Sequence, residues 1–128
     1  MWSKIILDTY GDNRGHLLPV EFQDLQFFPR RLYTIFGNQN GVDRGKHAHK
    51  SLQQLIICVT GSFVLHLDDG QSVEQILMNK PGKAVYLDGV VWRELRDLST
   101  NCVINVLASE PFDENDYIRS YEDFLELI

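Results

Sequence analysis

The sequence has few cysteines, no excess of positive charge and no long hydrophobic run. Two cysteines in 128 residues are too few for a disulfide-stapled secreted domain. The net charge of −6 argues against binding to a nucleic-acid polymer, which needs a basic face. No apolar run approaches the roughly 20 residues of a membrane-spanning helix, and the N-terminus lacks the pattern of a signal peptide. These absences predict a cytoplasmic protein that binds neither nucleic-acid polymers nor membranes, although a single nucleotide would need only local cations.

The length of 128 residues predicts one domain, 1–128, that can bury a core without disulfides or a structural metal. Short runs rich in Val, Ile, Leu, Phe and Tyr alternate with turn sequences containing Gly, Asn and Asp. The runs of strand length are KIILDTY, HLLPVEF, RRLYTIF, QQLIICVTG, FVLHLDDG, QSVEQILM, KAVYL, VVWREL and CVINVLA. Cys58 and Cys102 lie inside such runs and are expected to be buried free thiols. The pattern predicts an all-β domain, an antiparallel sandwich or small barrel of the jelly-roll kind.

Two local structures can be predicted within this domain. The stretch FVLHLDDGQSVEQIL, residues 63–77, has the composition of a β-hairpin. The end of the chain, YIRSYEDFLELI, predicts a short C-terminal helix, with the aspartates of PFDENDY capping its start. The apolar residues that recur there at helical spacing are Tyr117, Tyr121, Phe124 and Leu125.

The most informative stretch is GVDRGKHAHKSLQQ, residues 41–54. On a β-strand, His47 and His49 project to one face and Ala48 to the other. The stretch resembles the first signature of the cupins, in which a His-x-His pair is followed by an acidic metal ligand. Here Gln54 stands in place of that acidic residue. This resemblance implies a cupin-type jelly roll with the histidine pair facing its cavity.

The second cupin signature ends in a further histidine, and its counterpart YLDGVVWREL has Trp92 at that place. A typical metal-binding cupin offers three histidines and a glutamate. Here the corresponding set is His47, His49, an amide and an indole, which make a poor metal site. We therefore expect no metal and no other cofactor. We favour proton transfer over packing as the role of the pair, because two buried histidines would each need a polar partner.

A closer resemblance extends over nearly the whole chain. The segments that carry it, in order, are RG-x-L at 14–17, RRLYTIFG at 30–37, RGKHAHK at 44–50, QQLIICVTGS at 53–62, VWREL at 91–95, and VLAS with DYIRSYEDF near the end. They resemble the sugar-nucleotide 3,4-ketoisomerases that act on dTDP-4-keto-6-deoxy-glucose. The resemblance implies an enzyme that moves the ketone of a dTDP-linked 4-keto-6-deoxy sugar from C4 to C3. It also implies a homodimer, in this family with exchanged N-terminal strands.

The resemblance also suggests roles for particular residues. His47 is the candidate base at C3, His49 assists proton transfer or orients the sugar, and Tyr33 is a hydroxyl partner unless it only packs. Histidine suits such proton transfer because its usual pKa is near neutral. The candidates for substrate binding are Arg14, Arg44, Lys50, Arg93, Trp92 and Gln54. Arg44 and Arg93 are favoured for the diphosphate, while Trp92 could instead fill the barrel.

Three other functions stay open at this point. A related metal-free epimerase would act on the same class of dTDP-4-keto sugar but leave the ketone at C4. A non-catalytic cupin would bind the nucleotide sugar without turnover, and a metal-dependent cupin would need ligands beyond those identified. The configuration of the product at C4, galacto or gluco, is also left open by the sequence.

Overall fold

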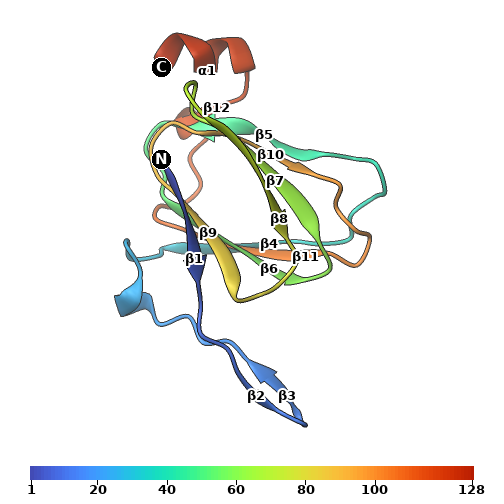
Figure 1. Cartoon of the computed structure of the whole chain (residues 1–128). Coiled ribbons are helices and arrows are strands. Elements are labelled where there is room, and N and C mark those ends of the chain that lie inside the picture. The colour runs from blue at the N-terminus through green and yellow to red at the C-terminus, as the bar shows by residue number, and fades with distance from the viewer.

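The computed structural model describes residues 1–128 as two facing antiparallel sheets with a helix at one end and a projecting hairpin at the other (Figure 1). The first sheet has the strand order β1-β9-β6-β11-β4 and the second β12-β5-β10-β7-β8, while β2 and β3 form the hairpin. The strands are β1 (Trp2–Ile6), β2 (Tyr10–Asp12), β3 (Gly15–Leu17), β4 (Arg31–Ile35), β5 (Arg44–His49), β6 (Gln54–Thr60), β7 (Phe63–Asp68), β8 (Val73–Met78), β9 (Lys83–Leu87), β10 (Trp92–Arg96), β11 (Val103–Ala108) and β12 (Tyr117–Ile118). The predicted all-β jelly-roll fold is confirmed.

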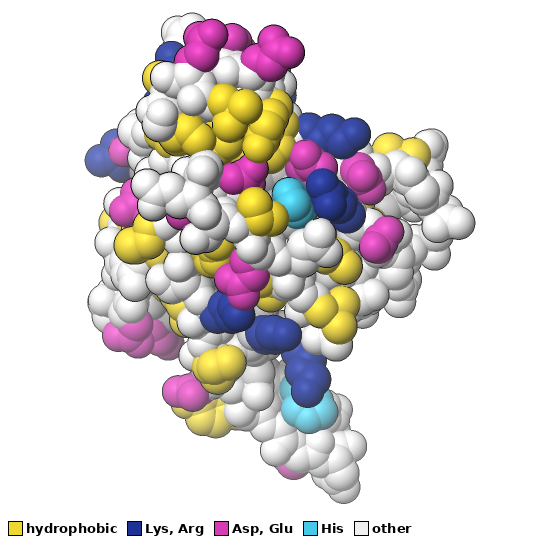
Figure 2. All heavy atoms as spheres, turned by 45° about the horizontal axis from the view of Figure 1, so that its top comes forward, with side chains coloured by type: hydrophobic (Ala, Val, Ile, Leu, Met, Phe, Trp, Pro, Cys, Tyr) yellow, Lys and Arg dark blue, Asp and Glu magenta, His cyan; other side chains and the backbone are white.

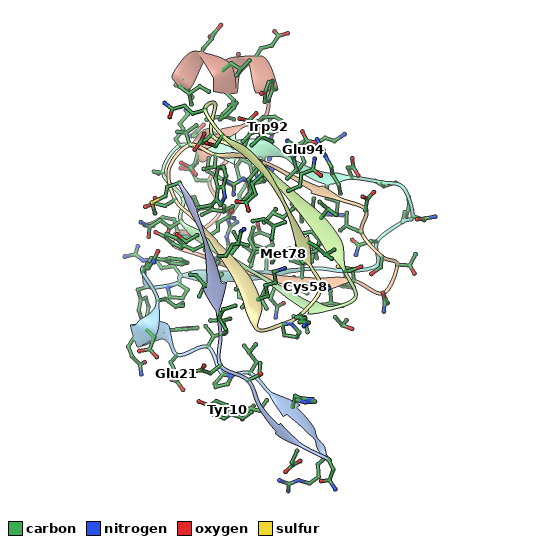
Figure 3. All side chains as sticks on the ribbon, viewed as in Figure 1. Tyr10, Glu21, Cys58, Met78, Trp92 and Glu94 are labelled. Atoms are coloured by element: carbon green, nitrogen blue, oxygen red, sulfur yellow. The ribbon has the colours of Figure 1, made fainter.

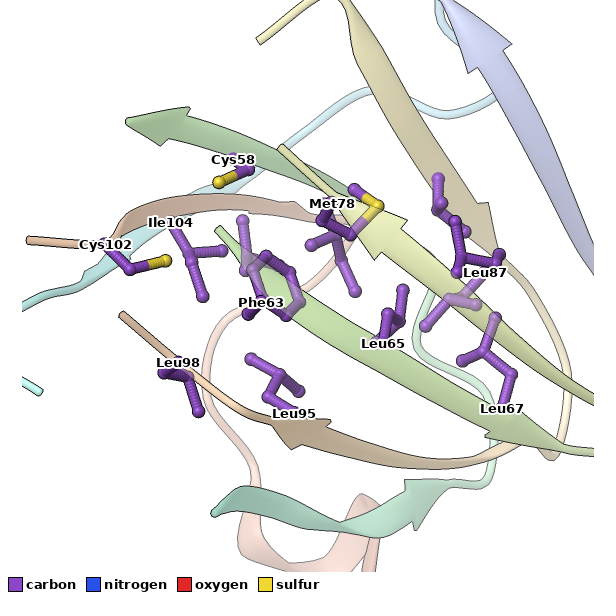
Figure 4. Packing of buried hydrophobic residues seen from close by; sticks show 14 of the residues in the cluster. Cys58, Phe63, Leu65, Leu67, Met78, Leu87, Leu95, Leu98, Cys102 and Ile104 are labelled. Atoms are coloured by element: carbon purple, nitrogen blue, oxygen red, sulfur yellow. The ribbon is translucent and has the colours of Figure 1, made fainter. Parts of the chain in front are cut away.

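The core lies between the two sheets and is built from alternating side chains. On β7, for example, Phe63, Leu65 and Leu67 point inward and are buried (Figure 4). This strand continues into β8 through a tight turn, as the predicted hairpin requires. Cys58 and Cys102 are free and buried, and they belong to the same apolar cluster. The thiols therefore pack as small hydrophobic groups.

The chain ends in helix α1 (Tyr121–Leu127), which is shorter than predicted. Ser120 caps its start by accepting a hydrogen bond from the backbone N–H of Asp123 at 3.3 Å. Asp113 instead caps the short 3-10 helix η2 (Glu114–Asp116). Tyr117 lies on β12, not in the helix, because its backbone pairs with β5. The helical spacing that includes Tyr117 was therefore misleading.

The predicted strand HLLPVEF is also shorter in the structure. β3 ends at Leu17, and the next element is the short 3-10 helix η1 (Phe22–Asp24). Pro19 lies between them, and proline cannot donate a hydrogen bond to a strand ladder.

The one α-helix of the structure is too short to span a membrane. Acidic side chains are spread over the face seen in Figure 2, whereas basic ones lie in a row where the body meets the hairpin.

Strand β5 contains a β-bulge just before the two histidines. The paired residues are Arg93 with His47 and Leu95 with Arg44, so β5 has one residue more than β10 between these pairs. Side chains alternate along a regular strand, which would place Arg44 and His47 on opposite faces. The extra residue reverses the alternation. Arg44 and His47 consequently face the same side of the sheet.

We predict that the bulge depends on Gly45, whose φ of 80° favours glycine. Alanine in such a left-handed conformation costs about 1–2 kcal/mol. At this position its Cβ would also come within 3.1 Å of the Leu95 side chain and 3.2 Å of the Arg93 carbonyl oxygen. Gly45→Ala should therefore lower the free energy of unfolding, measured with denaturant, more than the control Gly41→Ala. Gly41 has a φ of 79° and open space around it. Equal losses would show that the close contacts are unimportant.

Candidate active site

A cavity of about 400 Å³ opens between the two sheets. Its wall is formed by residues of β4, β5, β6, β10, β11 and β12. Four arginines line it, Arg31, Arg44, Arg93 and Arg119. The cavity is thus locally positive although the chain as a whole is acidic. Such a site suits an anionic ligand of moderate size.

The two histidines of β5 stand one behind the other at this cavity. His47 lines it, whereas His49 is completely buried. Their ring centres are 4.9 Å apart, and Tyr117 of β12 packs against both, at 4.9 Å from His47 and 4.3 Å from His49. Ala48 points the other way, into a separate apolar cluster. The predicted alternation on this strand is confirmed.

His49 is held by a carboxylate that the sequence analysis missed. Its Nδ1 lies 3.0 Å from Asp116 Oδ2, and the other carboxylate oxygen accepts hydrogen bonds from Ser51, from the backbone N–H at 2.9 Å and from Oγ at 3.0 Å. Partial burial acts to raise the pKa of Asp116, but the hydrogen bonds from Ser51 and His49 outweigh it and lower this pKa. Because this carboxylate is ionised, it can only accept a hydrogen bond, so Nδ1 of His49 carries the proton. The lone pair of neutral His49 is therefore on Nε2.

Both histidines are neutral at physiological pH. Burial, reinforced by the positive charge of Arg93, lowers the pKa of His47 to about 4 and that of His49 to about 3. Neither ring nitrogen of His47 has a hydrogen-bond partner, nor has Nε2 of His49. Buried polar atoms are normally paired. The unpaired nitrogens thus fit a site whose remaining partner is a polar ligand.

A second network joins Tyr33, Gln54 and Arg93 at the same cavity. Gln54 donates from Nε2 to the Tyr33 hydroxyl at 3.0 Å, and its Oε1 accepts a hydrogen bond from Arg93 Nη1. Arg93 also donates to the Val91 carbonyl oxygen, from Nη2 at 2.9 Å and from Nε at 3.3 Å. Burial raises the pKa of Tyr33, so its hydroxyl stays protonated. The cavity therefore combines neutral bases, a hydroxyl group and a fixed cation.

Comparison with known proteins places this arrangement in a family. The family described as "FdtA: WxcM-like, C-terminal" matches residues 2–128. The chain belongs to this family.

Individual proteins to which the chain is similar agree with this assignment. The TDP-4-oxo-6-deoxy-alpha-D-glucose-3,4-oxoisomerase of Aneurinibacillus thermoaerophilus is 41% identical over 118 residues, covering 91% of this chain and 85% of that protein. The crystal structure of QdtA, a sugar 3,4-ketoisomerase from Thermoanaerobacterium thermosaccharolyticum in complex with TDP, matches with a TM-score of 0.95 and 37% identity over 98% of this chain and 93% of that one. The WlaRB TDP-quinovose 3,4-ketoisomerase from Campylobacter jejuni gives 0.92 and 36%, over 98% and 97%. An rmlC epimerase from Mycobacterium tuberculosis shares the fold at 17% identity and a TM-score of 0.77, covering 91% of this chain and 66% of that one.

The structure brings six of the predicted family site residues together. His47, Tyr33, Arg44, Arg93 and Gln54 line the cavity, and His49 lies directly behind His47. Of these, Gln54 contacts protein groups on both sides of its amide. Its position is that of a bridge between Tyr33 and Arg93.

Trp92, Lys50 and Arg14 do not reach this cavity. Trp92 lies on the outer face of β10, beneath α1, and its indole N–H donates to Glu94 at 2.8 Å (Figure 3). It faces away from the cavity, because neighbouring residues on a strand face opposite sides. Arg93, one residue later, is the side chain that faces the histidines. Lys50 is exposed at the end of β5, and Arg14 pairs with Asp12 in the projecting hairpin.

The site also contains residues that the sequence analysis did not select. Asp116 was part of an acidic run that we interpreted as a helix cap, and Tyr117 belonged to the predicted helix. Arg119 stacks over the Tyr117 ring, with Cζ 4.3 Å from the ring centre. All three reach the site because β12 pairs with the end of β5. The motif DYIRSYEDF carried the only available signal, since it was one of the segments of family resemblance.

We predict that the two histidines make the protein acid-sensitive. Their pKa values are lowered on folding, from the usual 6.5 to about 4 for His47 and about 3 for His49. The unfolded state therefore binds more protons than the folded state below pH 6.5, and the free energy of unfolding must fall as the pH drops from about 6.5 to about 4. Chemical denaturation across this range should show the fall for the wild type and a smaller one for His47→Asn. An unchanged slope in that variant would contradict the assignment.

Proposed function

We propose that this chain is a dTDP-sugar 3,4-ketoisomerase, which moves the ketone of a dTDP-4-keto-6-deoxyhexose from C4 to C3. The observation that carries the proposal is a neutral, half-buried His47 facing a cavity lined by four arginines. A similar enzyme supports the substrate class, since a histidine-to-asparagine variant of QdtA, 36% identical to this chain, was crystallised with TDP-4-keto-6-deoxyglucose.

His47 is the proposed base that removes the proton from C3. Loss of this proton gives an enediol or enediolate, and return of a proton to C4 completes the movement of the ketone. The neutral imidazole is the form that accepts a proton, and its low pKa keeps it in this form. Asp116 positions the His49 ring, so that Nε2 is the nitrogen available for proton exchange. The substrate and product differ only in the positions of hydrogens and electrons, so the reaction needs no redox cofactor, and we propose that it needs no metal.

The arginines at the cavity rim are the proposed ligands of the diphosphate. Arg44 and Arg119 are exposed and Arg31 is half-buried, so all three can meet a group that stays partly hydrated. Arg44 faces the cavity because the bulge in β5 reverses the alternation of side chains. Arginine suits this role because its fork of N–H donors matches phosphate oxygens.

The decisive experiment follows dTDP-4-keto-6-deoxy-glucose by NMR in deuterated buffer with a chelator present. For the wild type we expect the 3-keto product, carrying deuterium at C4. His47→Asn should lower kcat by about 10²–10⁴-fold, because the base is lost while the shape is kept. His49→Asn should also impair turnover, and Arg96→Met, which alters an arginine outside the cavity, should not. The same spectrum gives the configuration at C4.

Other outcomes identify the competing functions. Deuterium exchange with the ketone still at C4 would indicate an epimerase, for which the fold similarity to the rmlC epimerase is the motivating observation. Binding of the nucleotide sugar with no exchange in any form would indicate a non-catalytic module. Activity that the chelator abolishes would indicate a metal-dependent enzyme. Each of these results would contradict the proposed function.

We also propose that the protein is a homodimer and is cytoplasmic. The homodimer is proposed because the outer face of the first sheet is apolar and incompletely covered. Leu55, Tyr86 and Phe27 line a groove of about 440 Å³ on that face. Nearby, Ile6 and Leu32 are 78% and 58% exposed. A second copy would cover these side chains. The two free thiols are compatible with a reducing compartment.

Light scattering should then give twice the chain mass of 14.8 kDa, and Leu32→Glu should shift the protein toward the monomer. In this chain β1 is an edge strand whose Ile5 pairs with Ala84 of β9. The double variant Ile5→Cys and Ala84→Cys tests whether that pairing is exchanged between subunits. A cross-linked dimer on a non-reducing gel supports exchange, whereas an internally linked monomer contradicts it.

A further inference from the structure

Arg93 is a buried cation without an anionic partner. It lies on β10, in the middle of the second sheet, and is 2% exposed. Its three hydrogen-bonding nitrogens donate only to neutral oxygens, those of the Gln54 amide and the Val91 carbonyl. None of the six ion pairs of the chain includes it. A full positive charge is therefore held inside the domain by groups that do not neutralise it.

Such a charge opposes folding, because water solvates a guanidinium better than two neutral oxygens do. The hydrogen bonds to Gln54 and Val91 need donors but not a charge. A neutral donor of similar size would make the same hydrogen bonds without the cost of burying a charge. No carboxylate of the chain is paired with the guanidinium, and Asp116 acts on it only from a distance. This points to an anion that reaches Arg93 only when the cavity is filled.

The position of Arg93 indicates which anion this is. Its backbone pairs with that of His47, and both side chains line the cavity. The more exposed Arg44 and Arg119 stand where a diphosphate can keep part of its hydration. Arg93 lies beside the base, where negative charge develops as the proton leaves. A fixed cation shielded from water stabilises such developing charge more than an exposed one does.

We propose that Arg93 stabilises the enediolate formed when His47 removes the C3 proton; this inference rests on the proposed ketoisomerase function. The C3–H bond breaks, its electrons form the C3–C4 double bond, and the C4 carbonyl π pair moves onto the C4 oxygen. That oxygen becomes the alkoxide that Arg93 faces. In the second half the C3 hydroxyl proton passes to the C4 oxygen and the C3 carbonyl forms. Protonated His47 gives a proton to C4, which restores the neutral base, and no oxidant is required.

Other groups near Arg93 are consistent with a cation that persists through this cycle. Tyr33 and Tyr117 carry hydroxyl groups near it, and Asp116 is engaged by His49 and Ser51. Burial lowers the pKa of Arg93 to about 10, which leaves it protonated at neutral pH. The same charge helps to lower the pKa of His47. Arg93 thus favours both the base before the transfer and the anion after it.

The test compares Arg93→Met, Arg93→Lys and the control Arg96→Met, whose arginine is on the same strand but outside the cavity and paired with Glu94. Arg93→Met should lower kcat by about 10²–10³-fold, the typical effect of losing one oxyanion-stabilising group, with the Kd for TDP changed less than about threefold. Arg93→Lys should recover part of kcat. Arg93→Met leaves the Gln54 and Val91 oxygens without their donor, so its melting temperature should fall, and the assay is run below it. If that variant is unfolded, Arg93→Lys and Arg93→Ala provide the same comparison.

Two further readouts separate electrostatic stabilisation from packing. In Arg93→Met the acid limb of the kcat/KM profile should move to higher pH, because a charge that lowers the His47 pKa is gone. Added guanidinium should restore turnover to Arg93→Ala, and urea, which is neutral and of similar shape, should not.

Some results would overturn the role of Arg93 and leave the proposed function intact. An active wild type with near-normal kcat in Arg93→Met, or a loss confined to TDP binding, would overturn the role of Arg93 alone. Equal rescue by urea would do the same. A wild type that does not move the ketone would overturn the proposed function and the inference with it.

Discussion

The buried guanidinium of Arg93 constrains the groups around it, because each of its N–H donors needs an acceptor that is itself fixed. Gln54 supplies one acceptor, and the other half of its amide donates to Tyr33. These three residues come from β10, β6 and β4, so the network connects the two sheets. Reversal of the Gln54 amide would place a donor against a donor. The floor of the cavity is therefore fixed by hydrogen bonding as well as by packing.

The protonation states of the histidine pair follow from opposing charges on two sides. Arg93 and burial lower both pKa values, while Asp116 acts in the opposite direction on His49. Tyr117 packs against both rings. The result is a pair of neutral imidazoles, one open to the cavity and one oriented from behind. A single histidine in water would have neither property.

The sequence predicted those features that depend on local periodicity. The twofold repeat of a strand was enough to place His47 and His49 on one face, and the turn DDG was enough for the β7–β8 hairpin. The sequence did not predict the features that depend on how the strands pair with one another. The cupin frame assigned the key position to Trp92, but strand pairing turns Arg93 inward instead. Asp116 could not be located, because it meets His49 across 67 positions of the chain and its local sequence resembles a helix cap.

The bulge in β5 has an evolutionary consequence. The two histidines are fixed by the pairing on one side of it, whereas the residues before it are set by the pairing on the other. Gain or loss of one residue at the bulge would exchange the side chains that border the cavity mouth and leave the histidines undisturbed. A lineage could in this way vary the groups that meet the nucleotide without rebuilding the chemistry beneath them. Small insertions and deletions, and not only substitutions, are thus an accessible route to new ligand preferences in this fold.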